Sequence, residues 1–166
     1  MAATTAAALM TAASLAAVPS TAVAADNPVV CTGETKSVYG SDGYVWTRAE
    51  ACFQVRDRLI YPVYRFQCQY SWGGRWYNDK TCTVRMQPGI QPIENPGKNT
   101  VTSHLVTGSG TGEFDVSGDR GLSCDLAVKG IALAGTFNAN QYWDSSPNTN
   151  PHGELPVAHV HENVCD

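Results

Sequence analysis

Hydrophobic and polar residues alternate with a period of two along three stretches of the chain, at residues 51–55, 64–70 and 82–86. Alternation of this kind is typical of β-strands that bury one face and leave the other face in solvent. Turn-forming residues separate the stretches, around residues 59–62 and at Gly73-Gly74. The pattern therefore predicts an antiparallel meander of strands.

The meander, over residues 50–87, is followed by a connection rich in Pro and Gly at residues 87–99. Three further strands are expected after this connection, over residues 100–106, 112–117 and 122–128. In the last of these strands the hydrophobic side chains stand at alternate positions, so we expect them to share one face.

The periodicity places the chain in the all-β class. After residue 25 no stretch of about ten residues has the period of an α-helix. About seven short strands separated by turns predict a disulfide-bonded antiparallel β-sandwich. We expect a single sandwich domain over residues 49–166, preceded by an extended N-terminal segment over residues 26–48 that lacks a sustained hydrophobic face.

Residues 1–25 contain no Asp, Glu, Lys or Arg and combine an apolar stretch with Pro19 and the small residues Ala24 and Ala25. This pattern is typical of a secretory signal peptide, with cleavage after Ala24 or Ala25. An Ala-rich amphipathic helix of the domain is the alternative, but it would need a polar face, and the segment offers only Thr and Ser for one. The leader predicts an extracellular protein. Because the apolar run 6–18 is too short to span a bilayer, we expect no membrane partner.

All six cysteines follow the predicted leader: Cys31, Cys52, Cys68, Cys82, Cys124 and Cys165. An even number of cysteines in an exported chain predicts three disulfides. A zinc site is the competing interpretation, and it requires closely paired cysteines of the C-x-x-C type, which the sequence lacks.

The side on which each cysteine points favours one of the fifteen possible connectivities. Cys68 and Cys82 lie on the hydrophobic faces of neighbouring strands and can bond inside the sandwich, whereas Cys52 lies on the polar face. Cys31, before the first strand, is the nearest candidate to pair with Cys52. Cys124 and Cys165 then remain for each other.

Two segments are candidates for binding a partner. The turn Trp72-Gly-Gly-Arg75-Trp76-Tyr77 combines the residue types that dominate protein-binding hot spots, although its rings could instead cover one end of the sandwich. The second segment is formed by four residues with extended, proline-restricted and β-branched character: Asn27, Pro28, Val29 and Val30. If Cys31 ties this segment to the domain, it can be presented to a partner at a reduced entropic cost.

The sequence holds no motif that specifies a reaction, and neither G-x-S-x-G, a P-loop nor H-E-x-x-H occurs. The string Gly118-Asp119-Arg120-Gly121 resembles the active-site turn of serine proteases, but Arg120 stands where the nucleophile should be. The charged fraction of 16% and the net charge of −4 also argue against binding to nucleic acid. We therefore expect a protein without catalytic residues or a cofactor.

One cluster of histidines could ligate a metal ion. On an extended strand His159 and His161 point to the same side, as two ligands of one ion would, and a third ligand could come from His152 or Glu154. Histidines near a chain terminus are usually solvated instead. We therefore expect no metal here and keep His159 and His161 as the candidates to test.

The leader and the cysteine-bearing segments Ala51–Val55, Phe66–Gly74 and Thr81–Val84 resemble the small secreted, disulfide-linked β proteins of actinobacteria. These proteins include the adaptor subunits of antibacterial umbrella toxin particles, which join a lectin-bearing protein to a large toxin subunit. The resemblance implies a role as a component of an extracellular, toxin-related assembly.

Three hypotheses on function follow. The first is a secreted, non-catalytic adaptor that binds another secreted protein. The second is a glycan-binding module that uses Trp72, Trp76 and Tyr77 as stacking surfaces. The third is an extracellular enzyme or enzyme inhibitor.

Overall fold

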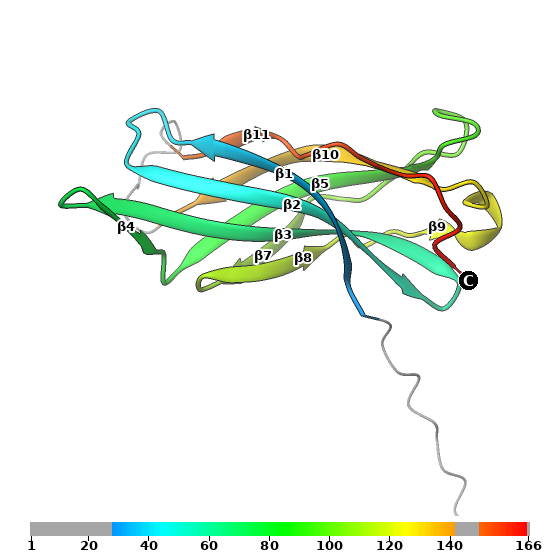
Figure 1. The fold of residues 1–166 in the computed structure, drawn as a ribbon, viewed down its shortest axis with the longest axis horizontal. Coiled ribbons are helices and arrows are strands. Elements are labelled where there is room, and N and C mark those ends of the chain that lie inside the picture. Colours follow the sequence, from blue (N-terminus) through cyan, green and yellow to red (C-terminus); the bar gives the residue numbers. More distant parts are fainter. Residues whose placement is uncertain (1–27, 142–149, 166) are drawn as a thin grey trace, which may run out of the picture.

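The computed structural model describes residues 28–141 and 150–165, which form two antiparallel β-sheets with a shared hydrophobic core. The two layers run along the long axis of the molecule (Figure 1). The fold is the predicted all-β, disulfide-bonded sandwich. The predicted leader and Asn27 lie outside the described residues.

Sheet A is built around one long hairpin. Its strands are β1 (Val30–Tyr39), β2 (Val45–Arg56), β3 (Leu59–Trp72), β4 (Arg75–Asn78), β8 (Glu113–Ser117) and β9 (Leu122–Ser123). β2 and β3 pair without interruption from Val45↔Tyr70 to Arg56↔Leu59. The other edge of β3 is shared by β9, β8 and β4 in turn, so β3 holds the sheet together.

Sheet B is built around the pair of β5 and β10. Its strands are β5 (Cys82–Pro92), β6 (Val101–Thr102), β7 (Val106–Gly110), β10 (Ile131–Asn140), β11 (His152–Glu154) and β12 (Ala158–Val160). β11 and β12 pair with β10 at one edge, and β6 and β7 pair with β5 at the other.

The core fills the space between the inward faces of the two sheets. Phe66 of β3 lies at its centre, with ring centroids 5.6 Å from Phe137 and 6.2 Å from Phe114. Met86 and Leu133 are fully buried beside them. Burial of side chains of this size contributes about 1.5–3 kcal/mol each, so the contact between sheets is the main source of stability.

The cysteines pair consecutively, as predicted. Bonds join Cys31 to Cys52, Cys68 to Cys82 and Cys124 to Cys165. Cys31 and Cys52 are direct partners in the β1–β2 pairing, which explains how a cysteine on the outer face of β2 becomes buried.

The turn expected at residues 59–62 is wrong, because those residues continue β3. The chain turns earlier, at Asp57-Arg58, with φ of 50° and 59°. Pro62 is tolerated inside the strand because its carbonyl accepts from the Gly118 N–H, on the side away from β2. Its missing N–H therefore removes no bond of the β2–β3 ladder.

The connection expected at residues 87–99 is also too long, because β5 continues to Pro92 through its pairing with β10. Pro88 again turns its carbonyl away from that ladder, where it accepts from the Ser103 N–H. The connection itself spans residues 93–100.

The segment 26–48, expected to precede the domain, contributes its residues 30–39 to sheet A as β1, and β2 begins at Val45. β1 lies at the edge of the sheet, and its Val38 packs against the core. An edge strand needs few hydrophobic side chains, which is why this segment lacks a hydrophobic face. The sandwich therefore includes β1 and does not start at residue 49.

The strand expected over residues 122–128 is wrong beyond Ser123. A 3₁₀ turn, η1 (Cys124–Leu126), follows β9, and Leu126 and Val128 are exposed instead of sharing a buried face. The Ala127 N–H donates to the Cys124 carbonyl, so the chain bends where the disulfide holds Cys124. No helix within the described residues is long and apolar enough to cross a membrane.

Tyr64 gives the core a measurable response to alkaline pH. Its side chain is fully buried, its hydroxyl donates to the Pro156 carbonyl at 3.4 Å, and burial raises its pKa far above the usual value of about 10. At a pH above about 10, unfolding exposes the Tyr64 hydroxyl, which then releases a proton that it retains in the folded state. The free energy of unfolding should therefore fall as pH rises above about 10, with a contribution from Tyr64 of up to about 1.4 kcal/mol per pH unit.

Chemical denaturation over this pH range tests the expectation. Tyr64→Phe should flatten the pH dependence, whereas Tyr39→Phe, at an exposed position, should leave it unchanged. An identical slope in wild type and Tyr64→Phe would contradict the assignment.

Candidate functional site

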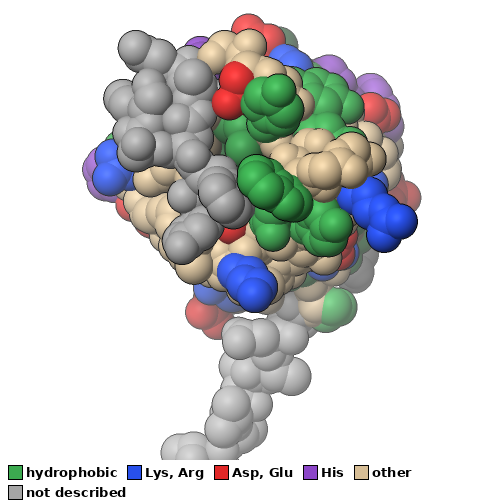
Figure 2. All heavy atoms as spheres, turned by 90° about the vertical axis from the view of Figure 1, so that its left-hand side faces the viewer, with side chains coloured by type: hydrophobic (Ala, Val, Ile, Leu, Met, Phe, Trp, Pro, Cys, Tyr) green, Lys and Arg blue, Asp and Glu red, His purple; other side chains and the backbone are tan. Residues whose placement is uncertain are grey.

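Exposed aromatic side chains gather at one end of the sandwich, where the β1–β2 and β3–β4 turns lie. We call this surface the aromatic end; it consists of the exposed Tyr39, Tyr44, Trp72, Trp76 and Tyr77 together with the half-buried Tyr70. Figure 2 shows hydrophobic side chains grouped on this end of the molecule. Every exposed Trp or Tyr among the described residues belongs to it.

Two tight turns hold these rings in place. Gly73 and Gly74 form the two-residue β3–β4 turn with φ of 57° and 75°, values that a side chain makes unfavourable. The β1–β2 turn is closed by the Gly40 N–H, which donates to the Val45 carbonyl, and the Asp42 carboxylate accepts from the Tyr44 N–H. Glycine geometry therefore shapes the first turn and local hydrogen bonds close the second, so the aromatic side chains project from turns of defined shape.

Two pairs of these rings are in contact. Tyr70 and Tyr77 stack with their centroids 5.6 Å apart, while Tyr39 meets Trp76 edge to face at 6.0 Å and 63°. Between the two turns lies a hollow of about 440 Å³, lined by residues that include Tyr44 and Trp72. Such a hollow can receive one side chain or one small ring of a partner.

The predicted residues of this end do not share one face. Trp72 pairs with Arg75 and Ser71 pairs with Trp76, so Trp72 and Trp76 point to opposite sides of the β3–β4 hairpin. Tyr77 points to the same side as Trp72. Trp72, Trp76 and Tyr77 therefore form a projecting knob and not a flat platform.

The other predicted binding segment lies elsewhere. Val30 begins β1 opposite Phe53, far along the hairpin from the aromatic end (Figure 1). Together with His159 and His161 it lines a second hollow of about 440 Å³ between β1 and β12. The structure thus brings the start of β1 next to the histidines and separates it from Trp72.

The two candidate metal ligands are neighbours, with ring centroids 6.2 Å apart and nearly parallel. The proposed third ligands lie farther along β10: His159 pairs opposite Ala132, but Glu154 pairs opposite Thr136 and contacts Lys36 at 3.6 Å.

Among the described residues one group has three ligand-type side chains close together, namely Cys31, Glu50 and Cys52. Its two cysteines are joined in a disulfide and offer no thiolate. The described residues therefore provide no assembled set of three free metal ligands.

A cluster around Asp119 contains the residue types of a catalytic triad. The His104 Nδ1 lies 2.6 Å from the Asp119 carboxylate, and the His104 Nε2 lies 2.6 Å from Arg120. Since a guanidinium can only donate, Nε2 must accept, and Nδ1 carries the proton that is donated to Asp119. This hydrogen bond lowers the pKa of Asp119.

The geometry does not activate a nucleophile. Ser103 is buried, and its hydroxyl accepts weakly from the Arg120 N–H, at 3.4 Å. Because the His104 Nε2 is already paired with Arg120, it is not available as a base for Ser103.

The sequence pattern predicted the part of the aromatic end that lies within one short stretch of the chain. It did not identify Tyr39, Tyr44 and Tyr70 as site residues. A signal was present: Tyr39 and Tyr44 flank the Gly-Ser-Asp-Gly string 40–43, which is typical of a hairpin turn. Comparisons with protein families, curated proteins and solved structures give no match for the chain.

The β3–β4 turn yields a test of the site's backbone. A Cβ at Gly74 would meet no atom within 4 Å, so the cost of Gly74→Ala arises from its left-handed backbone, at about 1–2 kcal/mol of unfolding free energy. Gly89→Ala is the matched control, because Gly89 has ordinary strand geometry and room for a methyl group; it should maintain or raise stability. Urea denaturation measures both. Equal stabilities of Gly74→Ala and wild type would contradict the turn geometry.

Proposed function

We propose that the protein is a secreted, non-catalytic adaptor that binds another extracellular protein through its aromatic end. The observation that carries the proposal is the convergence of all exposed Trp and Tyr side chains of the described residues on one end of the sandwich. Isolated exposed hydrophobic residues are ordinary, but a concentrated group of them usually marks an interaction site.

The composition of the aromatic end favours a protein partner. Trp, Tyr and Arg are the residues most enriched in hot spots, and the exposed Arg75 lies beside Trp72 in the hairpin. Trp72 is 66% exposed, so it has much surface to bury on binding. The hollow next to it offers a place for a side chain of the partner.

The ring geometry speaks against the glycan-stacking alternative at this end. Stacking on a polysaccharide chain favours rings that face the same way, whereas Trp72 and Trp76 point to opposite sides and Tyr39 meets Trp76 at 63°. A projecting group of rings in several orientations is better suited to insertion into a pocket of a protein.

Secretion and the adaptor role have separate support. The three disulfides fit an oxidising compartment, and residues 1–25 have the pattern of an export leader. The resemblance to adaptor subunits of toxin particles supports a place in an extracellular assembly. Val30 at the start of β1, with Pro28 and Val29 immediately before it, offers a further contact surface away from the aromatic end.

The proposal predicts that Trp72→Ser/Trp76→Ser abolishes co-elution of a stoichiometric protein from the culture medium of the producing organism. Loss of a hot-spot Trp costs about 2 kcal/mol or more of binding free energy. Affinity purification with the wild-type protein and the variant as baits, followed by mass spectrometry, measures the loss.

Leu126→Ser/Val128→Ser is the matched control, because both side chains are exposed hydrophobics near η1, at the opposite end of the sandwich. It should retain the partner. If the Trp variant still retains the co-eluting protein, the aromatic end is not the contact surface, and the start of β1 is the next candidate. Capture of a polysaccharide in place of a protein would contradict the proposed class of partner.

A further inference from the structure

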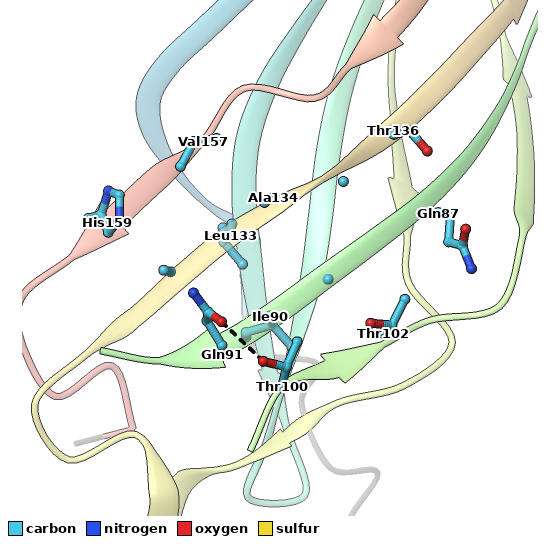
Figure 3. Close-up of a pocket in the computed structure, with 13 residues that line it drawn as sticks. Gln87, Ile90, Gln91, Thr100, Thr102, Leu133, Ala134, Thr136, Val157 and His159 are labelled. Carbon is cyan, nitrogen blue, oxygen red and sulfur yellow. Dashed lines mark hydrogen bonds between the residues drawn. The ribbon is translucent and has the colours of Figure 1, made fainter. Parts of the chain in front are cut away.

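The outer face of sheet B has a shallow hollow (Figure 3), which shares no lining residue with the hollow at the aromatic end. Its volume is about 330 Å³, a size typical of small-molecule sites. The floor lies where Gly89 of β5 pairs opposite Ala134 of β10, with Gly135 next to it. These residues present only Cα atoms and one methyl group, so the floor is apolar and lies below the longer side chains around it.

The rim of the hollow carries uncharged polar groups, chiefly Gln87, Gln91, Thr100, Thr102 and Thr136. The Thr100 hydroxyl donates to the Gln91 amide oxygen at 3.0 Å, which leaves the amide nitrogen directed toward β10 (Figure 3). Within the described part of the chain, the side chains of Gln87, Thr102 and Thr136 make no hydrogen bond. No Asp, Glu, Lys or Arg of that part lines the hollow.

The backbone conformation at Gly89 does not require a glycine. Its φ is not in the left-handed region, and a Cβ there would meet nothing closer than the Val101 carbonyl oxygen at 3.7 Å. Gly135 differs, because a Cβ there would lie 2.5 Å from the Gln87 carbonyl oxygen. A glycine inside a strand lowers stability, and often marks a place where a ligand approaches the backbone. Gly89 keeps the hollow open at a cost in stability.

We propose that this hollow binds an uncharged saccharide unit. A pyranose ring has an apolar C–H face and a rim of hydroxyl groups, which matches an apolar floor surrounded by amides and hydroxyls. Sugar hydroxyls donate and accept hydrogen bonds, as Thr hydroxyls and Gln amides do. Among the described residues that line the hollow, the one titratable side chain is His159, and none is a carboxylate, ammonium or guanidinium group. A neutral sugar needs no charged partner, so it fits this lining better than an ionised ligand does.

Titration of the ¹⁵N-labelled protein with maltotriose, cellotriose, mannotriose and N,N′,N″-triacetylchitotriose tests the proposal. At least one of these sugars should shift the amide signals of Gly89, Ala134 and Gly135 and the side-chain amide signals of Gln87 and Gln91 in a saturable manner. Shifts confined to the aromatic end, or no shift with any of the four sugars, would overturn it. Shifts at the hollow with a neutral extended peptide, and with none of the sugars, would also overturn the assignment to a saccharide.

Gly89→Val separates binding from folding. The new side chain fills the hollow while its Cβ meets only ordinary contacts, so the variant should fold with unchanged or higher stability and bind the sugar at least tenfold more weakly. Asn138→Val is the control on the same outer face, because Asn138 is exposed on β10 and does not line the hollow; it should bind as the wild type does. A folded Gly89→Val protein with wild-type affinity would refute the site. Since the hollow is separate from the aromatic end, Trp72→Ser/Trp76→Ser should leave the sugar shifts in place.

Discussion

The disulfide between Cys68 and Cys82 joins the two sheets at the position where the aromatic end begins. Cys68 belongs to β3 of sheet A and Cys82 to β5 of sheet B, and both are fully buried. The chain between them forms the end of β3, the turn and β4, and carries four of the six rings of the aromatic end. A bond that closes a loop of this length contributes about 3 kcal/mol by restricting the unfolded chain.

Polar contacts surround this bond and extend its effect. The Thr47 hydroxyl lies 3.8 Å from the Cys68 sulfur, and Gln141 donates its side-chain amide to the same hydroxyl at 2.8 Å. The Asp79 N–H donates to the Cys68 carbonyl, which holds the end of β4 near β3. The backbone of the hairpin that carries these rings is thus held in place before any partner arrives, and the backbone entropy lost on binding is smaller than it would be for a free loop.

The two proposed binding surfaces occupy different parts of the sandwich. The aromatic end is formed mainly by the turns of sheet A, and the hollow around Gly89 lies on the outer face of sheet B. A protein partner at the first would leave the second open to a saccharide. On these proposals, one small domain could connect a protein to a glycan without any change in conformation.

The fold could be predicted from the sequence where strands bury one face. Alternation revealed β2, β3 and β5 and placed Cys68 and Cys82 on facing sides, which led to the correct pairing. It failed for β1, an edge strand with little to bury, and at Pro62 and Pro88, whose carbonyls turn away from the central ladders. Those outcomes depend on neighbouring strands that a local pattern does not identify.

The candidate site could be predicted only where it is contiguous. Trp72, Arg75, Trp76 and Tyr77 lie within one hairpin, whereas Tyr39 reaches them through the pairing of β1 with β2 and β3. The hollow on sheet B depends on the register that sets Gly89 opposite Ala134, two residues far apart in the sequence. No local pattern contains that register.

Hydrogen exchange of Cys68→Ala/Cys82→Ala, compared with Cys31→Ala/Cys52→Ala, tests the central claim most directly. If the inter-sheet bond holds the aromatic end, amides of β4 and of the Gly73-Gly74 turn will exchange faster in the first variant. In the second variant, which loses a bond between neighbouring strands, those amides will keep wild-type protection. Unchanged protection of β4 in Cys68→Ala/Cys82→Ala, or equal loss in both variants, would contradict the account.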